Sequence, residues 1–200
     1  MSDPQDRKPF IDVPGDLPGI RSLFAFKPET GAALSEFAQT LLRGSSPLTP
    51  GERETIAAYV SSRNETYFCT QSHAATAAVL VDGGRDVIDA VIEDVESAAI
   101  DPKLRALLRI ADKVRESGLA VTPEDVEQAR AAGAKDEDIH DAVLVAAAFC
   151  MFNRYVDGLA TIAPRERTAY EQMGAVLATA GYVAAGAAPG SAPGAGEGDQ

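Results

Sequence analysis

Cys69 and His73 are the side chains of this sequence whose types and spacing best suit chemistry. On a helix, a separation of four residues places the thiol and the imidazole on one face, one turn apart. A thiol is a weak nucleophile until it loses its proton, and a neighbouring imidazole is a common acceptor of that proton. The pair indicates an activated-cysteine site, although the same two residues can also be buried core side chains with no chemical role.

Glu54 can supply the carboxylate that orients such a pair. A break at residues 64–66 separates two predicted helices, and an antiparallel arrangement of these helices brings Glu54 towards His73. A carboxylate next to the imidazole raises its basicity and selects its tautomer. The alternative is an exposed glutamate in the first turn of a helix, which the helix dipole favours.

The same break places Cys69 in the first turn of its helix, predicted over residues 67–81. Unpaired backbone N–H groups and the positive end of the helix dipole favour a thiolate there, so we predict a lowered pKa for the Cys69 thiol. Cys150 lies in the apolar run 146–152 and is predicted to be an inert core residue.

The elements that must position these residues are all helices. The segment from Thr49 to Glu52 has the spacing of a capping box, with a proline at the first helical position, and predicts a helix to about residue 64. The segment 137–159 is apolar almost all round at its centre and predicts a buried central helix. Further helices are predicted over 21–27, 30–43, 86–99, 102–117, 123–132 and 165–182.

These patterns predict an all-α, single-domain bundle, in which the hairpin that carries Glu54 and Cys69 packs on the long buried helix. Residues 1–18 are polar and proline-rich and are expected to form an N-terminal arm, with the helical domain over 19–183. Residues 184–200 consist mostly of Gly, Ala, Pro and Ser. They cannot bury a core and are expected to be disordered.

Composition excludes several classes of function. The net charge of -12 disfavours nucleic acid and anionic membranes as partners. No apolar run reaches the roughly 18 residues of a membrane span, and the N-terminus lacks a signal-peptide core. Two cysteines do not make a disulfide scaffold, so we expect a cytoplasmic protein with reduced thiols. A metal site is not expected, because no second Cys or His lies near Cys69 and His73.

A family resemblance strengthens the chemical interpretation. Residues 48–64 and 67–75 resemble the alkylhydroperoxidase D-like family of the carboxymuconolactone decarboxylase superfamily, and its peroxidase-related branch in particular. Residues 152–159 resemble a segment that this branch carries near its C-terminal end, and the likeness extends over about 14–182. The resemblance implies a cofactor-free, homo-oligomeric thiol peroxidase that acts on hydrogen peroxide or organic hydroperoxides.

The family signature is a glutamate, then Cys-x-x-Cys, then a histidine. Glu54, Cys69 and His73 occupy the glutamate, the second cysteine and the histidine, but Thr66 stands where the family has its first cysteine. The resemblance implies that Cys69 attacks peroxide and becomes a sulfenic acid. Since Thr66 cannot form a disulfide, the usual resolving step is lost and an external thiol must complete the cycle. Thr66 can instead cap its helix or hydrogen-bond a bound substrate.

Other interpretations of the same residues remain open. On the decarboxylase side of the superfamily, Glu54 and His73 would perform acid–base chemistry on a small lactone or carboxylate, with Cys69 as a bystander. A non-catalytic oligomeric scaffold is a third possibility. Asn153, Arg154 and Asp157 are expected to form a structural polar cluster at a helix end or a subunit contact, where the spacing allows Arg154 to pair with Asp157, and a supporting role near the site is the alternative.

Overall fold

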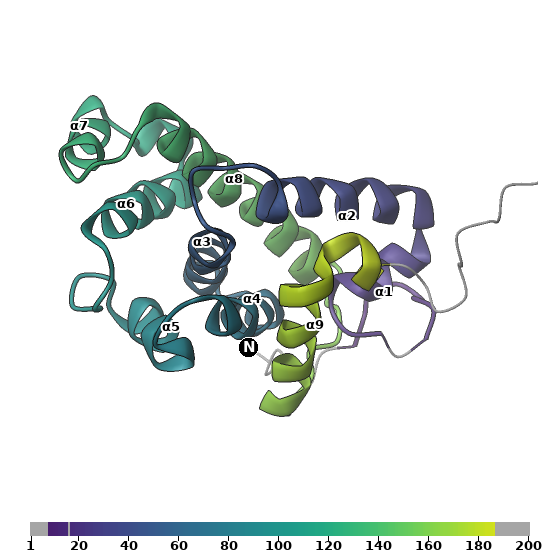
Figure 1. Cartoon of the computed structure of the whole chain (residues 1–200). Coiled ribbons are helices and arrows are strands. Elements are labelled where there is room, and N and C mark those ends of the chain that lie inside the picture. Colours follow the sequence, from purple (N-terminus) through teal and green to yellow (C-terminus); the bar gives the residue numbers. More distant parts are fainter. Residues whose placement is uncertain (1–7, 16, 187–200) are drawn as a thin grey trace, which may run out of the picture.

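The computed structural model describes residues 8–15 and 17–186, and this part of the chain is helical without strands, as predicted (Figure 1). Short loops connect the helices, which pack into one bundle around a main apolar core with two smaller apolar clusters beside it. The elements are α1 (Ile20–Phe26), α2 (Pro28–Arg43), α3 (Pro50–Arg63), α4 (Tyr67–Leu80), α5 (Gly84–Glu93), α6 (Pro102–Glu116), the short 3₁₀ helix η2 (Gly118–Ala120), α7 (Pro123–Ala131), α8 (Asp136–Gly158) and α9 (Arg167–Gly186).

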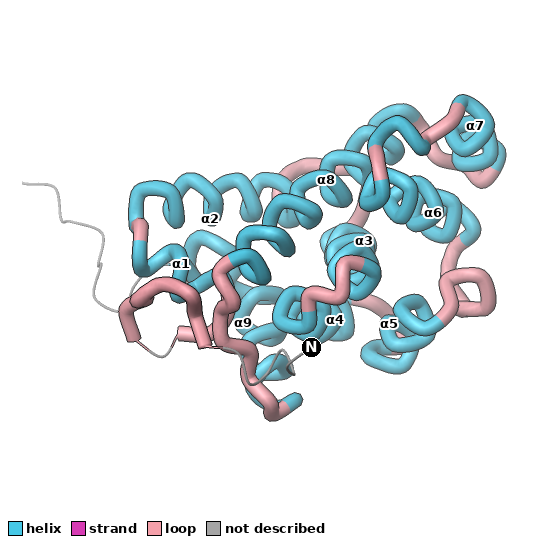
Figure 2. The backbone as a smooth tube through the Cα atoms, turned by 180° about the vertical axis from the view of Figure 1, so that it is seen from behind, coloured by secondary structure: helices cyan, strands magenta, loops and turns pink. Residues whose placement is uncertain are grey.

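Helices α3 and α4 form the predicted antiparallel hairpin (Figure 2). The capping box at the start of α3 is present: the Thr49 hydroxyl accepts the Glu52 N–H, and the Glu52 carboxylate accepts the Thr49 N–H. Between the helices, Glu65 adopts a left-handed conformation with φ of 59°, which reverses the chain within three residues. The hairpin therefore begins and turns where the sequence predicted.

The predicted packing of the hairpin on the long helix α8 is confirmed, and it runs through α3. Helix α3 packs on α8 and α6, whereas α4 packs mainly on α9 and α5. The most completely buried helix is α3. The expectation that α8 is buried all round is wrong on one face, because Leu144 and Met151 are 38% and 40% exposed. Helix α8 turns its buried face to α3 and α6 and leaves the face that carries Leu144 and Met151 exposed.

Helix α8 is also the one helix in the described part of the chain that is long and apolar enough to cross a membrane by length and composition alone. Nine of its residues, among them Phe149 and Phe152, are buried inside the bundle. Core packing therefore accounts for its hydropathy, because the same apolar side chains contact α3 and α6.

Two helix ends also differ from the prediction. Helix α5 stops at Glu93, not at residue 99, because Asp94 leaves the helical conformation and its carboxylate accepts the Glu96 N–H. Helix α9 extends to Gly186, so residues 184–186 of the predicted tail are helical. The predicted disorder of 187–200 lies outside the described residues, as do residues 1–7 and 16 of the predicted arm. The described arm residues form no helix.

Candidate active site

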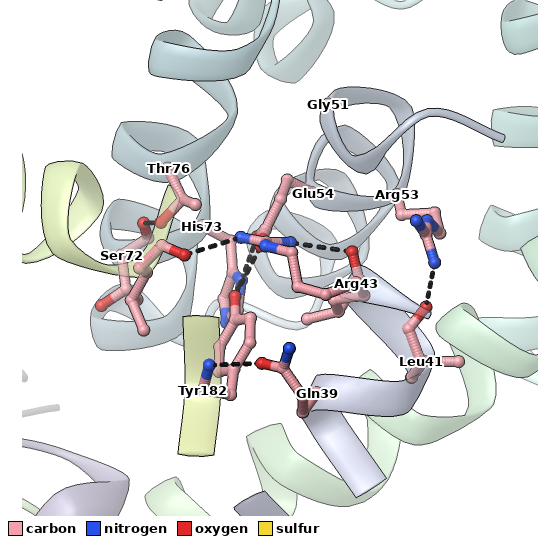
Figure 3. Close-up of polar contacts among 12 residues, drawn as sticks. Gln39, Leu41, Arg43, Gly51, Arg53, Glu54, Ser72, His73, Thr76 and Tyr182 are labelled. Atoms are coloured by element: carbon pink, nitrogen blue, oxygen red, sulfur yellow. Dashed lines mark hydrogen bonds and ion pairs between the residues drawn. The ribbon is translucent and has the colours of Figure 1, made fainter. Parts of the chain in front are cut away.

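A buried carboxylate, Glu54, is the centre of the site. Its side chain is 0% exposed and accepts three contacts (Figure 3). One carboxylate oxygen, Oε2, lies 2.7 Å from His73 Nδ1. The other, Oε1, lies 2.7 Å from Arg43 Nη2 and 2.6 Å from the Tyr182 hydroxyl. The structure therefore brings Glu54 and His73 together across the hairpin, as the sequence predicted.

Glu54 is held in its ionised form. Burial by itself raises the pKa of this carboxyl, but the charge and hydrogen bond of His73, together with Arg43 and Tyr182, lower the pKa below the ordinary value. The carboxylate engages Nδ1 of His73, so Nε2 is the ring nitrogen left for chemistry. The edge of the Phe149 ring, with centroids 4.5 Å apart, helps to fix the imidazole plane.

Tyr182 is a site residue that the sequence analysis missed. Its ring stacks on His73 with an interplanar angle of 15°, and its hydroxyl lies 3.3 Å from His73 Nδ1. Burial and the negative charge of Glu54 raise the pKa of Tyr182 well above its usual value, so the phenol remains protonated and donates to Glu54.

A kink in α9 places Tyr182 in the site. Gly181 has φ of 73° and ψ of -166°, which leaves the helical region, and the next N–H donates to Oε1 of Gln39 at 2.7 Å. The positive φ at position 181 strains any residue with a side chain, and a Cβ atom there would also displace the Gln39 side chain, whose Oε1 would lie 2.3 Å away, so the kink favours glycine. A glycine directly before a tyrosine late in an otherwise helical segment was the available sequence signal for this kink.

Arg43 is the second residue that the sequence analysis missed. Besides its ion pair with Glu54, its guanidinium donates to the backbone carbonyls of Leu42 and Leu177 and lies 5.2 Å from the centroid of the Tyr182 ring. The last turn of α2 and the end of α9 are thereby tied to the buried carboxylate. No local sequence pattern links Arg43 to Glu54, because tertiary packing alone brings α2 to this place.

Cys69 lies in the first turn of α4, as predicted, but its thiol is not activated in the resting structure. The side chain is 4% exposed, and within the described chain no hydrogen bond joins its sulfur to His73. Burial raises the pKa of the thiol to about 12; a hydrogen bond from Asn153 opposes this rise, and the charge of Asp157 adds to it. The predicted low pKa is therefore wrong, since desolvation outweighs the helix dipole at this position.

Thr66 is buried at the N-terminus of α4 and its hydroxyl donates to the carboxylate of Asp157. It makes no side-chain capping bond to its own helix, so the expected cap is absent. The expected Arg154–Asp157 ion pair is also absent: Arg154 is exposed and donates to the Cys150 carbonyl. Of the predicted polar cluster, Asp157 and Asn153 reach the cysteine site and Arg154 does not.

Cys150 packs against the main apolar core, as predicted, but is less buried than a core residue. It is only partly buried, and its sulfur accepts a weak contact of 3.8 Å from the side-chain amide of Asn64. The same amide donates to Asn153 at 2.8 Å, and Asn153 in turn contacts Cys69. Both cysteines are free thiols, separated by this pair of carboxamides.

Cys69 and His73 line one cavity. Its volume is about 630 Å³, and helices α1, α2, α4, α8 and α9 provide its walls. Cys69, His73 and Tyr182 lie on the wall, which is otherwise mostly aliphatic and aromatic. Within the described ranges, no three His, Cys, Asp or Glu side chains are grouped so as to hold a metal ion. The arrangement can therefore present a thiol and an acid–base pair to one small molecule.

Comparison with known proteins agrees with this architecture. Residues 28–113, which include Glu54, Cys69 and His73, match the family described as "Carboxymuconolactone decarboxylase family". No curated protein sequence matches the chain significantly.

Two solved structures are similar over most of the chain. One is an uncharacterized peroxidase-related protein from Silicibacter sp. TM1040, with 28% identity and a TM-score of 0.70, covering 77% of this chain and 78% of the other. The second, described as an alkylhydroperoxidase AhpD core, is an uncharacterized peroxidase-related protein from Ralstonia eutropha JMP134. The sequence identity to this protein is 28% and the TM-score is 0.71, and the superposition covers 79% of this chain and 81% of the other.

Proposed function

Residues 28–113 belong to the carboxymuconolactone decarboxylase family, and from this premise we propose that the protein is a thiol-dependent peroxidase acting on hydrogen peroxide or organic hydroperoxides. One observation carries the proposal: Cys69 and His73 line the same cavity, and the Glu54 carboxylate holds the imidazole of His73 through its Nδ1 atom. The two similar structures, both named peroxidase-related, support the same activity.

The reaction begins with transfer of the thiol proton. Because the pKa of Cys69 is about 12 at rest, the thiolate forms only as peroxide binds and His73 accepts the proton. The sulfur then attacks the terminal oxygen of R–O–O–H and the O–O bond breaks. The leaving alkoxide takes the proton from His73. The products are the alcohol and a sulfenic acid on Cys69, with the ionised Glu54 stabilising the transient imidazolium.

An external thiol completes the cycle. Thr66 cannot resolve the sulfenic acid, so a small thiol attacks it, releases water and leaves a mixed disulfide on Cys69. A second thiol molecule attacks the disulfide, freeing Cys69 and leaving with the first as an external disulfide. This cycle requires two thiols per peroxide and no cofactor.

The raised pKa of Cys69 favours a second candidate, an acid–base enzyme of the decarboxylase type. The ionised Glu54, the protonated Tyr182 and His73 form an acid–base set that does not need the thiol. The substrate would be a small lactone or carboxylate. A scaffold without catalysis is the remaining alternative. The acid–base enzyme and the scaffold both differ from a peroxidase because they leave Cys69 reduced when peroxide is added.

Intact-mass analysis after one equivalent of peroxide separates these proposals. A peroxidase gains one oxygen atom on Cys69, or the mass of a thiol adduct when a thiol is present. Cys69→Ser abolishes the gain, His73→Gln slows it, and the matched control Cys150→Ser retains it. Peroxide consumption that persists in Cys69→Ser, or a native protein that stays unmodified, would refute the peroxidase.

We propose further that the protein is a cytoplasmic homo-oligomer. Both cysteines are free thiols, and the exposed face of α8 carries Leu144, Ala147 and Met151 at helical spacing. Such an apolar stripe is typical of contact surfaces between subunits. Light scattering coupled to size exclusion tests the assembly, and Met151→Glu should reduce the molecular mass if this face forms the contact.

A further inference from the structure

Arg21 of α1 lines the cavity, and no residue that the structure describes pairs with it. Its side chain is partly buried, yet in the described part of the chain it forms no ion pair and no hydrogen bond. A guanidinium carries five N–H donors and no acceptor, and those of Arg21 are open to the cavity and to solvent. The chain offers many acceptors, with 30 acidic residues against 18 basic ones. An arginine on a mostly apolar wall, with no acceptor among the described residues, therefore offers its donors to an anionic ligand that enters the cavity.

Ser35 on α2 supports this interpretation. It is 6% exposed and lines the same cavity, and its hydroxyl makes no hydrogen bond to any described residue. Other buried hydroxyls in these helices, such as those of Thr55 and Ser72, donate to the backbone carbonyl four residues earlier. The Ser35 hydroxyl thus remains available, on a neighbouring helix, to the ligand that Arg21 would bind.

The other residues of the cavity wall indicate that the rest of the ligand is apolar. Aromatic rings of Phe24, Phe68 and Phe149 line the cavity together with aliphatic side chains, and the volume of about 630 Å³ is that of a site for a small organic molecule. Hydrogen peroxide would leave most of this apolar surface unused. The ligand that fits has an extended apolar body and one anionic group.

We infer that the cavity binds an apolar monocarboxylic acid, with the carboxylate on Arg21 and Ser35 and the apolar body along the aromatic wall. Guanidinium and carboxylate match in planar geometry and form charge-assisted hydrogen bonds. The inference deepens the proposed peroxidase and rests on it for the reaction: the preferred substrate is an organic hydroperoxide that carries a carboxylate. The hydroperoxide group then meets Cys69 and His73, which line the same cavity.

Binding tests the inference without turnover. Isothermal titration calorimetry of the full chain compares decanoate with 1-decanol, both below their aggregation limits. Decanoate should bind about tenfold more tightly or better, the ratio expected for a hydrogen bond to a charged group. Arg21→Gln should abolish this preference and Arg21→Lys should retain part of it. The matched control Lys27→Gln, which removes an exposed charge just after the same helix, should retain all of it. Equal binding of the acid and the alcohol, or a preference that survives Arg21→Gln, would overturn the inference.

Turnover then tests the substrate class. The ratio of kcat/KM for a fatty-acid hydroperoxide to kcat/KM for cumene hydroperoxide should fall about tenfold in Arg21→Gln and stay constant in Lys27→Gln. An unchanged ratio in Arg21→Gln would reject the assignment while leaving the peroxidase standing. Tight binding of decanoate by a protein that consumes neither hydroperoxide would reject the peroxidase and leave the acid-binding site standing.

Discussion

Replacing Glu54 by glutamine removes the charge at the centre of the site and changes the side-chain volume little. The carboxylate is fully buried, and its three contacts are 2.6 to 2.7 Å long. Glutamine can still accept from Tyr182, but it leaves the Arg43 cation without its counter-charge. Arg43 is itself largely buried, so its remaining partners are the carbonyls of Leu42 and Leu177.

The expected loss of stability follows from this geometry. Removing one partner of a buried ion pair destabilises a protein by about 3 to 5 kcal/mol. Because the amide keeps part of the hydrogen bonding, we expect about 3 kcal/mol at neutral pH, near the lower end of that range. For a chain of this size the melting temperature should fall by about 6 to 12 °C. This contribution is present above the unfolded carboxyl pKa of 4.5 and is lost as the pH falls through the lowered pKa of folded Glu54.

Urea denaturation at pH 7 and at several values below 4.5 measures this effect. The difference between the native chain and Glu54→Gln should shrink as the pH falls. Glu36→Gln, the same change at an exposed position of α2, is the matched control and should shift the free energy of unfolding by less than about 0.5 kcal/mol. A loss at pH 7 under about 1 kcal/mol would refute the central role given to this carboxylate. Glu54→Gln combined with His73→Gln should lose less than the sum of the two single changes.

Three further predictions follow from the site. Iodoacetamide should modify Cys69 more slowly than Cys150 below pH 9, and peptide mapping should show that the Cys69 rate rises only towards pH 12. A Cys69 rate whose pH dependence has its midpoint near the ordinary thiol pKa of 9.0 would contradict the burial argument. The Thr66→Cys variant should form an intramolecular disulfide with Cys69 and resist over-oxidation by excess peroxide. Mass spectrometry of the Cys69 peptide measures both effects, and two cysteines that stay reduced after peroxide treatment would contradict the prediction. Tyr182→Phe should lower the free energy of unfolding in urea by about 1 to 2 kcal/mol, because the buried Glu54 carboxylate loses the hydrogen bond that the Tyr182 hydroxyl donates. An unchanged free energy of unfolding would mean that this hydrogen bond is not formed in solution.

Short-range rules made the hairpin predictable. The capping box at Thr49 and the break before Tyr67 depend on residues within one turn of each other, and the structure reproduces both. The pairing of Glu54 with His73 followed from the same local information, because a tight reversal between two helices brings their facing side chains together. A family-specific spacing then indicated which thiol lies beside them.

Other features depended on segments far apart in the chain. Tyr182 reaches His73 across 109 positions, through a kink that Gln39 holds from a third helix. Helix α8 looked buried all round because its composition is apolar, but only the packing of α3 and α6 shows which of its faces is covered. No periodicity in the sequence encodes these contacts.

The sequence by itself determined the helices, the hairpin and the meeting of Glu54 with His73, whereas Arg43 and Tyr182 entered the site only through the tertiary structure. The tertiary structure decided the ionisation of those residues. The helix start favours a thiolate at Cys69 and can be recognised locally, whereas desolvation depends on how completely distant segments cover the sulfur. Likewise Glu54 is buried yet ionised because His73 from the other helix of the hairpin, together with Arg43 and Tyr182 from distant helices, outweighs the cost of burying its charge. Solvation and charge are sums over everything that surrounds a group, and only the folded chain fixes what surrounds it.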